Sequence, residues 1–171
     1  TPSSVPLCDG TGIREIQTLQ TLMELIKNKA INPQAGFYFP LTLIAPDIEE
    51  YLRHLEGSRI YFGDLYALAG MPLVIKPFFG LMTMAQSSLH LATIKSMKGQ
   101  SVSLESSWQE KGKNLLVNQI KDCQYVVGDL PIISFYHRET DIFKGKELIT
   151  WSKHPQLEKV ISTYGFTKVH H

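Results

Sequence analysis

One stretch of the chain has the composition of a phosphate-binding turn. Leu104 ends an expected strand, Asn114 begins an expected helix, and Gly112 lies in the polar turn between them. Backbone amides at a helix N-terminus bind phosphate or pyrophosphate, and a glycine lets the ligand approach the backbone closely. Lys111 and Lys113 add positive charge. The alternative that these residues leave open is an ordinary turn between a strand and a helix.

Two titratable residues follow expected strands and are candidates to accept a proton. Glu105 follows the strand that ends at Leu104, and His137 follows an expected strand over residues 130–136. Sites in α/β proteins gather where strands end, and the unperturbed pKa of histidine suits proton transfer near neutral pH. Glu105 is therefore the first candidate for a general base and His137 the second. A solvated surface charge is the alternative for both residues.

Two further patterns involve cysteine and possible metal ligands. Cys123 falls on the apolar stripe of an expected helix over residues 114–123, which favours a buried structural thiol over a nucleophile. His137, Glu139 and Asp141 have a loose metal-ligand spacing, but a charged connection after a strand explains them more simply. We therefore expect no metal site.

The stretch around Gly112 also resembles the pyrophosphate-binding motif of the GNAT N-acetyltransferase superfamily. In that motif a Gln or Arg precedes two residues, a Gly, one residue and a further Gly or Ala. Gln109, Gly112 and Asn114 fill these places, and Trp108 matches the aromatic residue before the Gln. The resemblance implies that acetyl-CoA binds here as a cosubstrate. The implied cofactor-binding residues are Leu104, Ser106, Gln109, Glu110, Lys111, Gly112, Lys113 and Asn114.

Other segments are similar to the same superfamily. Residues 154–169 resemble its closing helix and Gly-Phe strand, residues 78–84 its central strand, and Ile13–Arg14 its opening. The sequence departs from the family pattern at two places. Ile161 stands where a Tyr often protonates the departing CoA thiolate, and Asn114 stands where the motif has a small residue.

The resemblance implies acetyl transfer from acetyl-CoA to an amine, carried by a small molecule or a peptide. The amine must be neutral to attack, so Glu105 or His137 would take its proton. Two alternatives stay open. The first is a GNAT-like domain that binds CoA or a protein without turnover, which the two departures favour. The second is an unrelated α/β interaction module.

The elements that position these residues are predicted from periodicity and turn residues. Helices are expected over residues 13–28, 47–55, 114–123 and 155–163. Strands are expected over residues 36–39, 41–44, 60–62, 73–75, 78–84, 89–94, 101–104, 130–136 and 166–169, with a polar connection over 138–151. Hairpins in the middle and strand–helix–strand units at the end predict an α/β (α+β) fold. We expect a mixed, mostly antiparallel central sheet flanked by helices, as in GNAT proteins.

Length and composition indicate one folded domain. The chain has 171 residues, 43% hydrophobic and 19% charged, which excludes a disordered polypeptide. The 17 basic and 16 acidic residues leave a formal net charge of +1, so we expect no nucleic-acid partner. We predict a single domain over residues 1–171, with an irregular lead-in over 1–12. His170–His171 resemble a tag remnant.

The remaining features concern the compartment of the protein. Cys8 and Cys123 are far apart and lack a dense cysteine framework, so we expect them to be reduced. No stretch approaches the length of about 20 apolar residues that a membrane span needs. Residues 1–12 have no apolar centre typical of a signal peptide. A cytoplasmic protein without a membrane partner is therefore expected, while its oligomeric state stays open.

Overall fold

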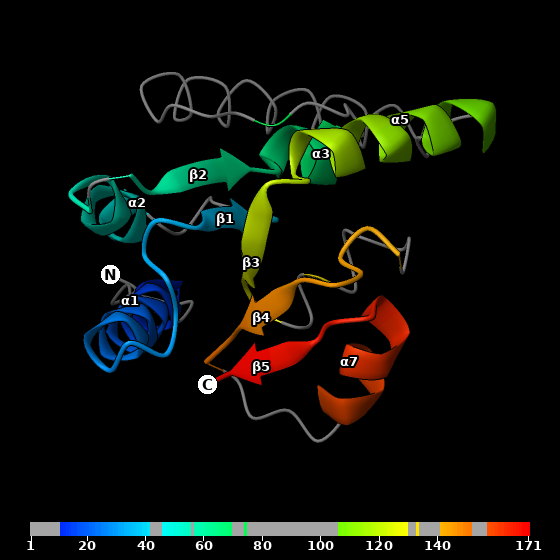
Figure 1. Cartoon of the computed structure of the whole chain (residues 1–171). Helices are drawn as coiled ribbons and strands as arrows, with labels where there is room; N and C mark the ends of the chain where they lie inside the picture. Colours follow the sequence, from blue (N-terminus) through cyan, green and yellow to red (C-terminus); the bar gives the residue numbers. More distant parts are fainter. Residues whose placement is uncertain are drawn as a thin grey trace, which may run out of the picture.

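The strands in the described part of the chain form a parallel sheet. The computed structural model describes residues 11–41, 46–55, 57–69, 74, 106–129, 133, 141–151 and 157–171. Within these ranges five strands pair in the order β2-β1-β3-β4-β5, and each neighbouring pair is parallel (Figure 1). The strands are β1 (Gly36–Phe39), β2 (Arg59–Phe62), β3 (Cys123–Val127), β4 (Glu147–Ile149) and β5 (Lys168–His170).

The predicted mixed, mostly antiparallel GNAT-like sheet is therefore wrong. Parallel strands are covered by helices on both faces, so a buried one is apolar at successive positions rather than at alternate ones. All four residues of β1 are buried, including the adjacent Phe37, Tyr38 and Phe39. The predicted hairpins depended on strands over residues 73–75, 78–84, 89–94 and 101–104, which lie outside the described residues except for Val74.

The helices cover both faces of the sheet. They are α1 (Thr11–Lys27), α2 (Pro46–Arg53), α3 (Asp64–Ala69), α5 (Ser106–Gln119) and α7 (Leu157–Tyr164). Figure 1 shows α1 and α2 on one side of the strands and α5 and α7 on the other. The predictions of α1, α2 and α7 are confirmed. The predicted third helix is present as α5, but it begins well before Asn114 and ends before Cys123.

Two apolar clusters hold these layers together. On one face, Leu22 of α1 and Leu52 of α2 pack with Phe37 and other side chains of the sheet. On the other face, Leu116 of α5 and Tyr164 of α7 pack in a cluster that includes Tyr38 and Val126. Complete burial of one large apolar side chain contributes about 1.5–3 kcal/mol, so each helix is fixed mainly by such contacts.

The C-terminal part of the chain differs from three predictions. The strand expected over residues 130–136 is not seen at Ile133, the described residue of that range, which is helical and donates its N–H to the Asp129 carbonyl at 3.0 Å. Within the predicted polar connection, Glu147–Ile149 form β4. His170, set aside as a tag remnant, is the last residue of β5 and only 5% exposed. Its Nε2 lies 2.6 Å from a Glu147 carboxylate oxygen, so this side chain is part of the packed domain.

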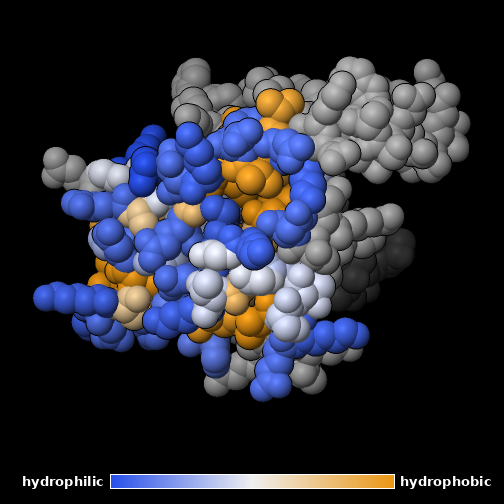
Figure 2. All heavy atoms as spheres, turned by 45° about the vertical axis from the view of Figure 1, so that its right-hand side comes forward, coloured by the Kyte–Doolittle hydropathy of each residue, from blue (hydrophilic) through white to orange (hydrophobic). Residues whose placement is uncertain are grey.

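The described surface is mostly polar. On the face shown in Figure 2, apolar residues reach the surface in separate patches among hydrophilic ones. Among the described residues, no helix is both long enough and apolar enough to cross a membrane. Cys123 is buried as predicted, although it lies in β3 instead of a helix, and Cys8 lies outside the described residues.

Candidate functional site

The best candidate site is the edge of the sheet at which the strands end. Because all five strands are parallel, their carboxyl ends meet along this edge. From β1 the chain passes to β2 on one side, and the later strands add on the other side beginning with β3. The position between β1 and β3 is therefore a topological switch point, and open α/β sheets bind their ligands outside the strand ends at such points.

A glycine–aspartate turn follows β2 and packs tightly against the end of β1. The N–H of Gly63 donates to the Phe39 carbonyl at 2.8 Å. A Cβ atom on Gly63 would lie 2.1 Å from the Tyr38 hydroxyl oxygen and 3.1 Å from the Pro40 carbonyl oxygen. No larger residue fits this position without displacing a buried tyrosine. The contact fixes Asp64, the next residue, beside the end of β1.

A second glycine–aspartate turn follows β3, on the other side of β1. The N–H of Gly128 donates to the Ile149 carbonyl at 3.1 Å, which ties this turn to β4. A Cβ atom on Gly128 would lie 3.7 Å from Cδ of Pro40, an ordinary contact distance. Gly63 and Gly128 thus both adjoin Pro40. The two turns, Gly63–Asp64 and Gly128–Asp129, flank the end of β1 and are called here the paired Gly–Asp turns.

The two aspartates of these turns are buried. Asp64 is 1% exposed and Asp129 is 7% exposed. Each makes a polar interaction within the protein. Asp64 is the first residue of α3, where a negative charge is favourable, and the Asp129 carbonyl accepts the N–H of the helical Ile133. Complete burial, and after it the Asp64 carboxylate, raise the pKa of Tyr38 well above its usual value. A carboxylate in this setting accepts hydrogen bonds from hydroxyl or amino groups.

The residues after β4 add a buried hydroxyl and an aromatic ring to the same edge. Thr150 is fully buried, and its N–H donates to the His170 carbonyl at 3.0 Å. Trp151, half-buried, follows it. None of the described residues directly after β1, β2, β3 or β4 is a lysine or arginine. The charged groups that the structure places at these strand ends are therefore acidic.

A metal centre is not formed by the part of the chain that the structure describes. Within it, no three His, Cys, Asp or Glu side chains gather as ligands of one ion. Asp141 instead pairs with Lys113, and the hydrogen bond from Lys113 lowers the pKa of that carboxyl group. His137 and Glu139 lie outside the described residues.

The predicted pyrophosphate turn is a helix. Residues 106–114 all lie in α5, so the backbone amides after the first turn donate to carbonyls within the helix. Only the first four amides, from Ser106 to Gln109, lack such partners. Gly112 is buried in the helix, Lys113 pairs with Asp141, and Asn114 is exposed. Binding of acetyl-CoA by these residues stays a prediction.

The remaining predicted site residues fall elsewhere. Leu104, Glu105 and His137 lie outside the described residues, so the structure does not bring them together with α5. Ser106, Gln109, Glu110 and Lys111 are placed only as backbone positions of α5.

Sequence reasoning missed Asp64 and Asp129, although a signal for them was present. The sequences Phe62-Gly63-Asp64-Leu65 and Val127-Gly128-Asp129-Leu130 share an apolar residue followed by Gly-Asp-Leu. A repeated strand end of this kind marks two equivalent positions on one edge of a parallel sheet.

No family model matches the chain, and no curated protein or solved structure matches it either.

Proposed function

We propose that this protein binds a small hydroxyl-bearing ligand of the nucleoside class at the carboxyl edge of its sheet, between the paired Gly–Asp turns. The observation that carries this proposal is the placement of two buried aspartates on either side of the β1 end, at the switch point of the sheet. Grooves at this point are the usual ligand sites of open α/β sheets.

The position of Asp64 supports a sugar diol as the recognised group. Asp64 lies two residues after Phe62, the last residue of β2, the strand adjacent to β1. In dinucleotide-binding α/β folds, an acidic side chain about 20 residues beyond the first turn accepts a hydrogen bond from a ribose hydroxyl. Asp129 offers a second acceptor from the opposite side of β1. Trp151 supplies an aromatic side chain at the same edge, of the kind on which a base stacks.

The charges at this edge favour a nucleoside over a phosphorylated ligand. The residues after β1, Pro40 to Pro46, contain no glycine, so the phosphate-binding sequence of dinucleotide-binding folds is absent there. Asp47, Asp64 and Asp129 are acidic, and a carboxylate repels a phosphate group unless a cation lies between them.

The glycine amides of the ¹⁵N-labelled protein provide a direct test. On titration with adenosine, the signals of Gly63 and Gly128 should shift, because their amides flank the proposed site. Gly57 and Gly145 lie before β2 and before β4, at the opposite edge, and their signals should stay in place. Adenine without its ribose should shift the same signals far less at equal concentration. Unmoved signals for Gly63 and Gly128, or equal shifts in all four glycines, contradict the proposal.

Matched variants separate the site from general effects on folding. Asp64→Asn keeps the shape of the side chain but removes its charge, and should weaken adenosine binding by about tenfold, as expected for a hydrogen bond to a charged group. Asp122→Asn is the control, because Asp122 is exposed in the turn before β3 and lies at the opposite end of that strand from Asp129.

Acetyl-CoA should be titrated separately in the same way, because the acyltransferase prediction has it as the cosubstrate. That prediction rested on a resemblance to GNAT sequence motifs, and the parallel sheet differs from the fold that this resemblance implied, so the geometry favours the nucleoside site. Shifts confined to the amides of Ser106 to Gln109 at the start of α5 would support the acyl-CoA prediction instead. An amine acceptor and a general base would then have to be sought.

A further inference from the structure

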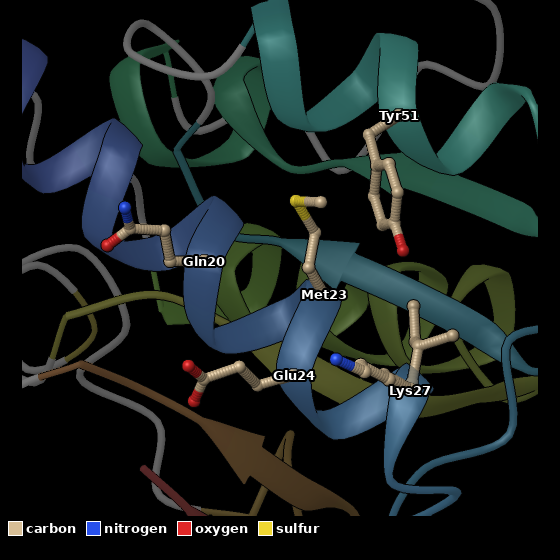
Figure 3. Close-up of a pocket in the computed structure, with 6 residues that line it drawn as sticks. Gln20, Met23, Glu24, Lys27 and Tyr51 are labelled. Carbon is tan, nitrogen blue, oxygen red and sulfur yellow. The ribbon is translucent and has the colours of Figure 1, made fainter.

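A groove with an apolar lining lies between α1 and α2, away from the carboxyl edge of the sheet. It has a volume of about 550 Å³ and is lined by Gln20, Met23, Glu24, Ile26, Lys27 and Tyr51. Figure 3 shows the Met23 side chain reaching from α1 towards α2, and the Tyr51 ring coming from α2 towards α1. Met23 is 45% exposed, and Ile16, two turns earlier on α1, is 55% exposed. Large apolar side chains at this level of exposure are suited to receive a partner's apolar group.

Basic residues gather at one end of this groove. Both α1 and α2 are followed by short turns into neighbouring parallel strands, so their C-terminal ends lie at the same edge of the sheet. The two turns touch, because the Ser58 hydroxyl donates to the Pro33 carbonyl. Five exposed basic residues lie in the last turns of α1 and α2 or in the residues that follow these helices: Lys27, Lys29, Arg53, His54 and Arg59. They are called here the basic cluster.

Helix capping accounts for part of the basic cluster but not for all of it. Lys27 and Arg53 lie in the last turns of their helices, where a cation interacts favourably with the helix dipole. Arg59 has no such position, since it is the first residue of β2, and Lys29 lies just beyond the last turn of α1. No ion pair between described residues involves any member of the cluster. None of the described carboxylates thus neutralises the cluster at ion-pair distance.

The backbone at Lys29 gives an independent reason to regard its side chain as functional. Its φ is 55°, the left-handed conformation, and the N–H of Ala30 donates to the Leu25 carbonyl while that of Lys29 donates to the Ile26 carbonyl. These two bonds define a Schellman motif, in which the position of Lys29 usually carries glycine. A lysine here is less favourable for the fold than a glycine, so its charge needs another explanation.

We propose that the groove and the basic cluster form a docking surface for an acidic peptide segment of a partner protein, with an apolar side chain that enters between Met23 and Tyr51. Methionine and tyrosine are enriched at protein interfaces, and a positive rim attracts acidic residues. A nucleic acid fits less well, because Met23 and Ile26 give the groove an apolar lining that suits a leucine or phenylalanine side chain rather than a phosphate group.

Fluorescence anisotropy with a defined probe tests this proposal. The probe is a short fluorescein-labelled peptide rich in Glu, with one Leu and one Phe. We expect saturable binding that weakens as salt rises, because salt screens exposed charges. Replacing Glu by Gln in the peptide, or Leu and Phe by Ser, should each weaken binding by about tenfold, the effect of losing several exposed charges or one buried apolar side chain. An oligothymidylate of equal charge should bind more weakly than the peptide.

Lys29→Gly separates binding from folding. The substitution relieves the left-handed backbone, so the urea midpoint should stay equal or rise while peptide affinity falls. A second pair of variants, Lys29→Gln and Lys168→Gln, tests the charge alone. Lys168 is exposed at the start of β5 and serves as the control, and glutamine is used in both because Lys168 does not share the left-handed backbone of Lys29. We expect Lys29→Gln to weaken peptide binding and Lys168→Gln to leave it unchanged.

Four results would overturn the proposal. The first is equal loss of binding in both glutamine variants, which would indicate a nonspecific charge effect. The second is tighter binding of the oligonucleotide, which would assign the surface to nucleic acid. The third is no binding of the peptide to the folded protein at low salt. The fourth is concentration-dependent dimerisation that Met23→Asp abolishes, which would assign the groove to a second copy of the chain.

Discussion

Substitution of the glycine in the first Gly–Asp turn is the sharpest structural test of the proposed site. In Gly63→Ala the new methyl group would lie 2.1 Å from the Tyr38 hydroxyl oxygen and 2.7 Å from its ring carbon Cζ. Tyr38 is fully buried and cannot move aside without displacing its own neighbours. Forcing an extra methyl group into a packed core costs about 1–3 kcal/mol. We expect a loss near the upper end of this range, because both contacts are shorter than real Cβ atoms allow.

Gly128→Ala provides the matched comparison. Gly128 occupies the same place in the second Gly–Asp turn, but its nearest atom to a new methyl group lies at 3.7 Å, and its φ is not positive. This substitution should leave stability within about 0.5 kcal/mol of the wild type, as for an unstrained surface change. Urea unfolding followed by circular dichroism would measure both variants under the same conditions.

A double variant tests the physical cause. Tyr38→Phe removes the hydroxyl that would clash most severely, but leaves the ring carbon 2.7 Å from the new methyl group. Gly63→Ala should therefore cost less in the Tyr38→Phe background than in the wild type, by about 1 kcal/mol, within the usual range of coupling between residues in contact. Equal midpoints for Gly63→Ala and Gly128→Ala, or strict additivity with Tyr38→Phe, would refute the packing that defines the paired Gly–Asp turns.

Two further predictions concern the opposite end of the sheet. Lys146 is 9% exposed, and its ammonium group donates to the carbonyls of Ile120 and Cys123, each at 2.7 Å. Lys146→Met should therefore lower the free energy of unfolding, measured in urea, by about 1.5–3 kcal/mol. An unchanged urea midpoint would show that these carbonyls do not need the lysine. Burial raises the pKa of Glu147, but hydrogen bonds, led by the one from His170, outweigh burial and hold the pKa below its usual value. Ionised Glu147 then stabilises the fold above its unfolded pKa, and this contribution is lost as the pH falls through the lowered pKa. The urea midpoint of Glu147→Gln should accordingly lie below that of the wild type at neutral pH and converge with it in acid, whereas a constant difference would exclude this linkage.

The helices of the N-terminal half follow from local sequence. Apolar residues recur at helical spacing in α1 and α2, and Pro46 begins α2 as a first-turn proline does. Both helices appear where the pattern predicts them. The same pattern does not predict which of the apolar side chains are buried in the core. Leu22 is fully buried, while Ile16 and Met23 of the same helix remain exposed, and Met23 lines the groove.

The sequence pattern does not determine whether the strands pair in parallel or antiparallel. A short apolar strand such as Gly36–Phe39 pairs equally well in either direction, and β4 has only three residues, too few to show a period. Only the helical crossovers and the burial of both faces make the sheet parallel. The antiparallel prediction took the direction of the whole sheet from expected hairpins over residues 73–104, of which only Val74 is described, whereas the described strands pair in parallel.

The candidate site was decided by the tertiary structure for the same reason. Gly112, in a polar stretch, suggested a ligand-binding turn, yet the surrounding residues propagate a helix and use its amides internally. Gly63–Asp64 and Gly128–Asp129 are far apart in the sequence and look like ordinary turns there. They become neighbours only because β2 and β3 pair on opposite sides of β1. Local sequence determined which segments are helical or extended, whereas long-range strand pairing determined which side chains share an edge.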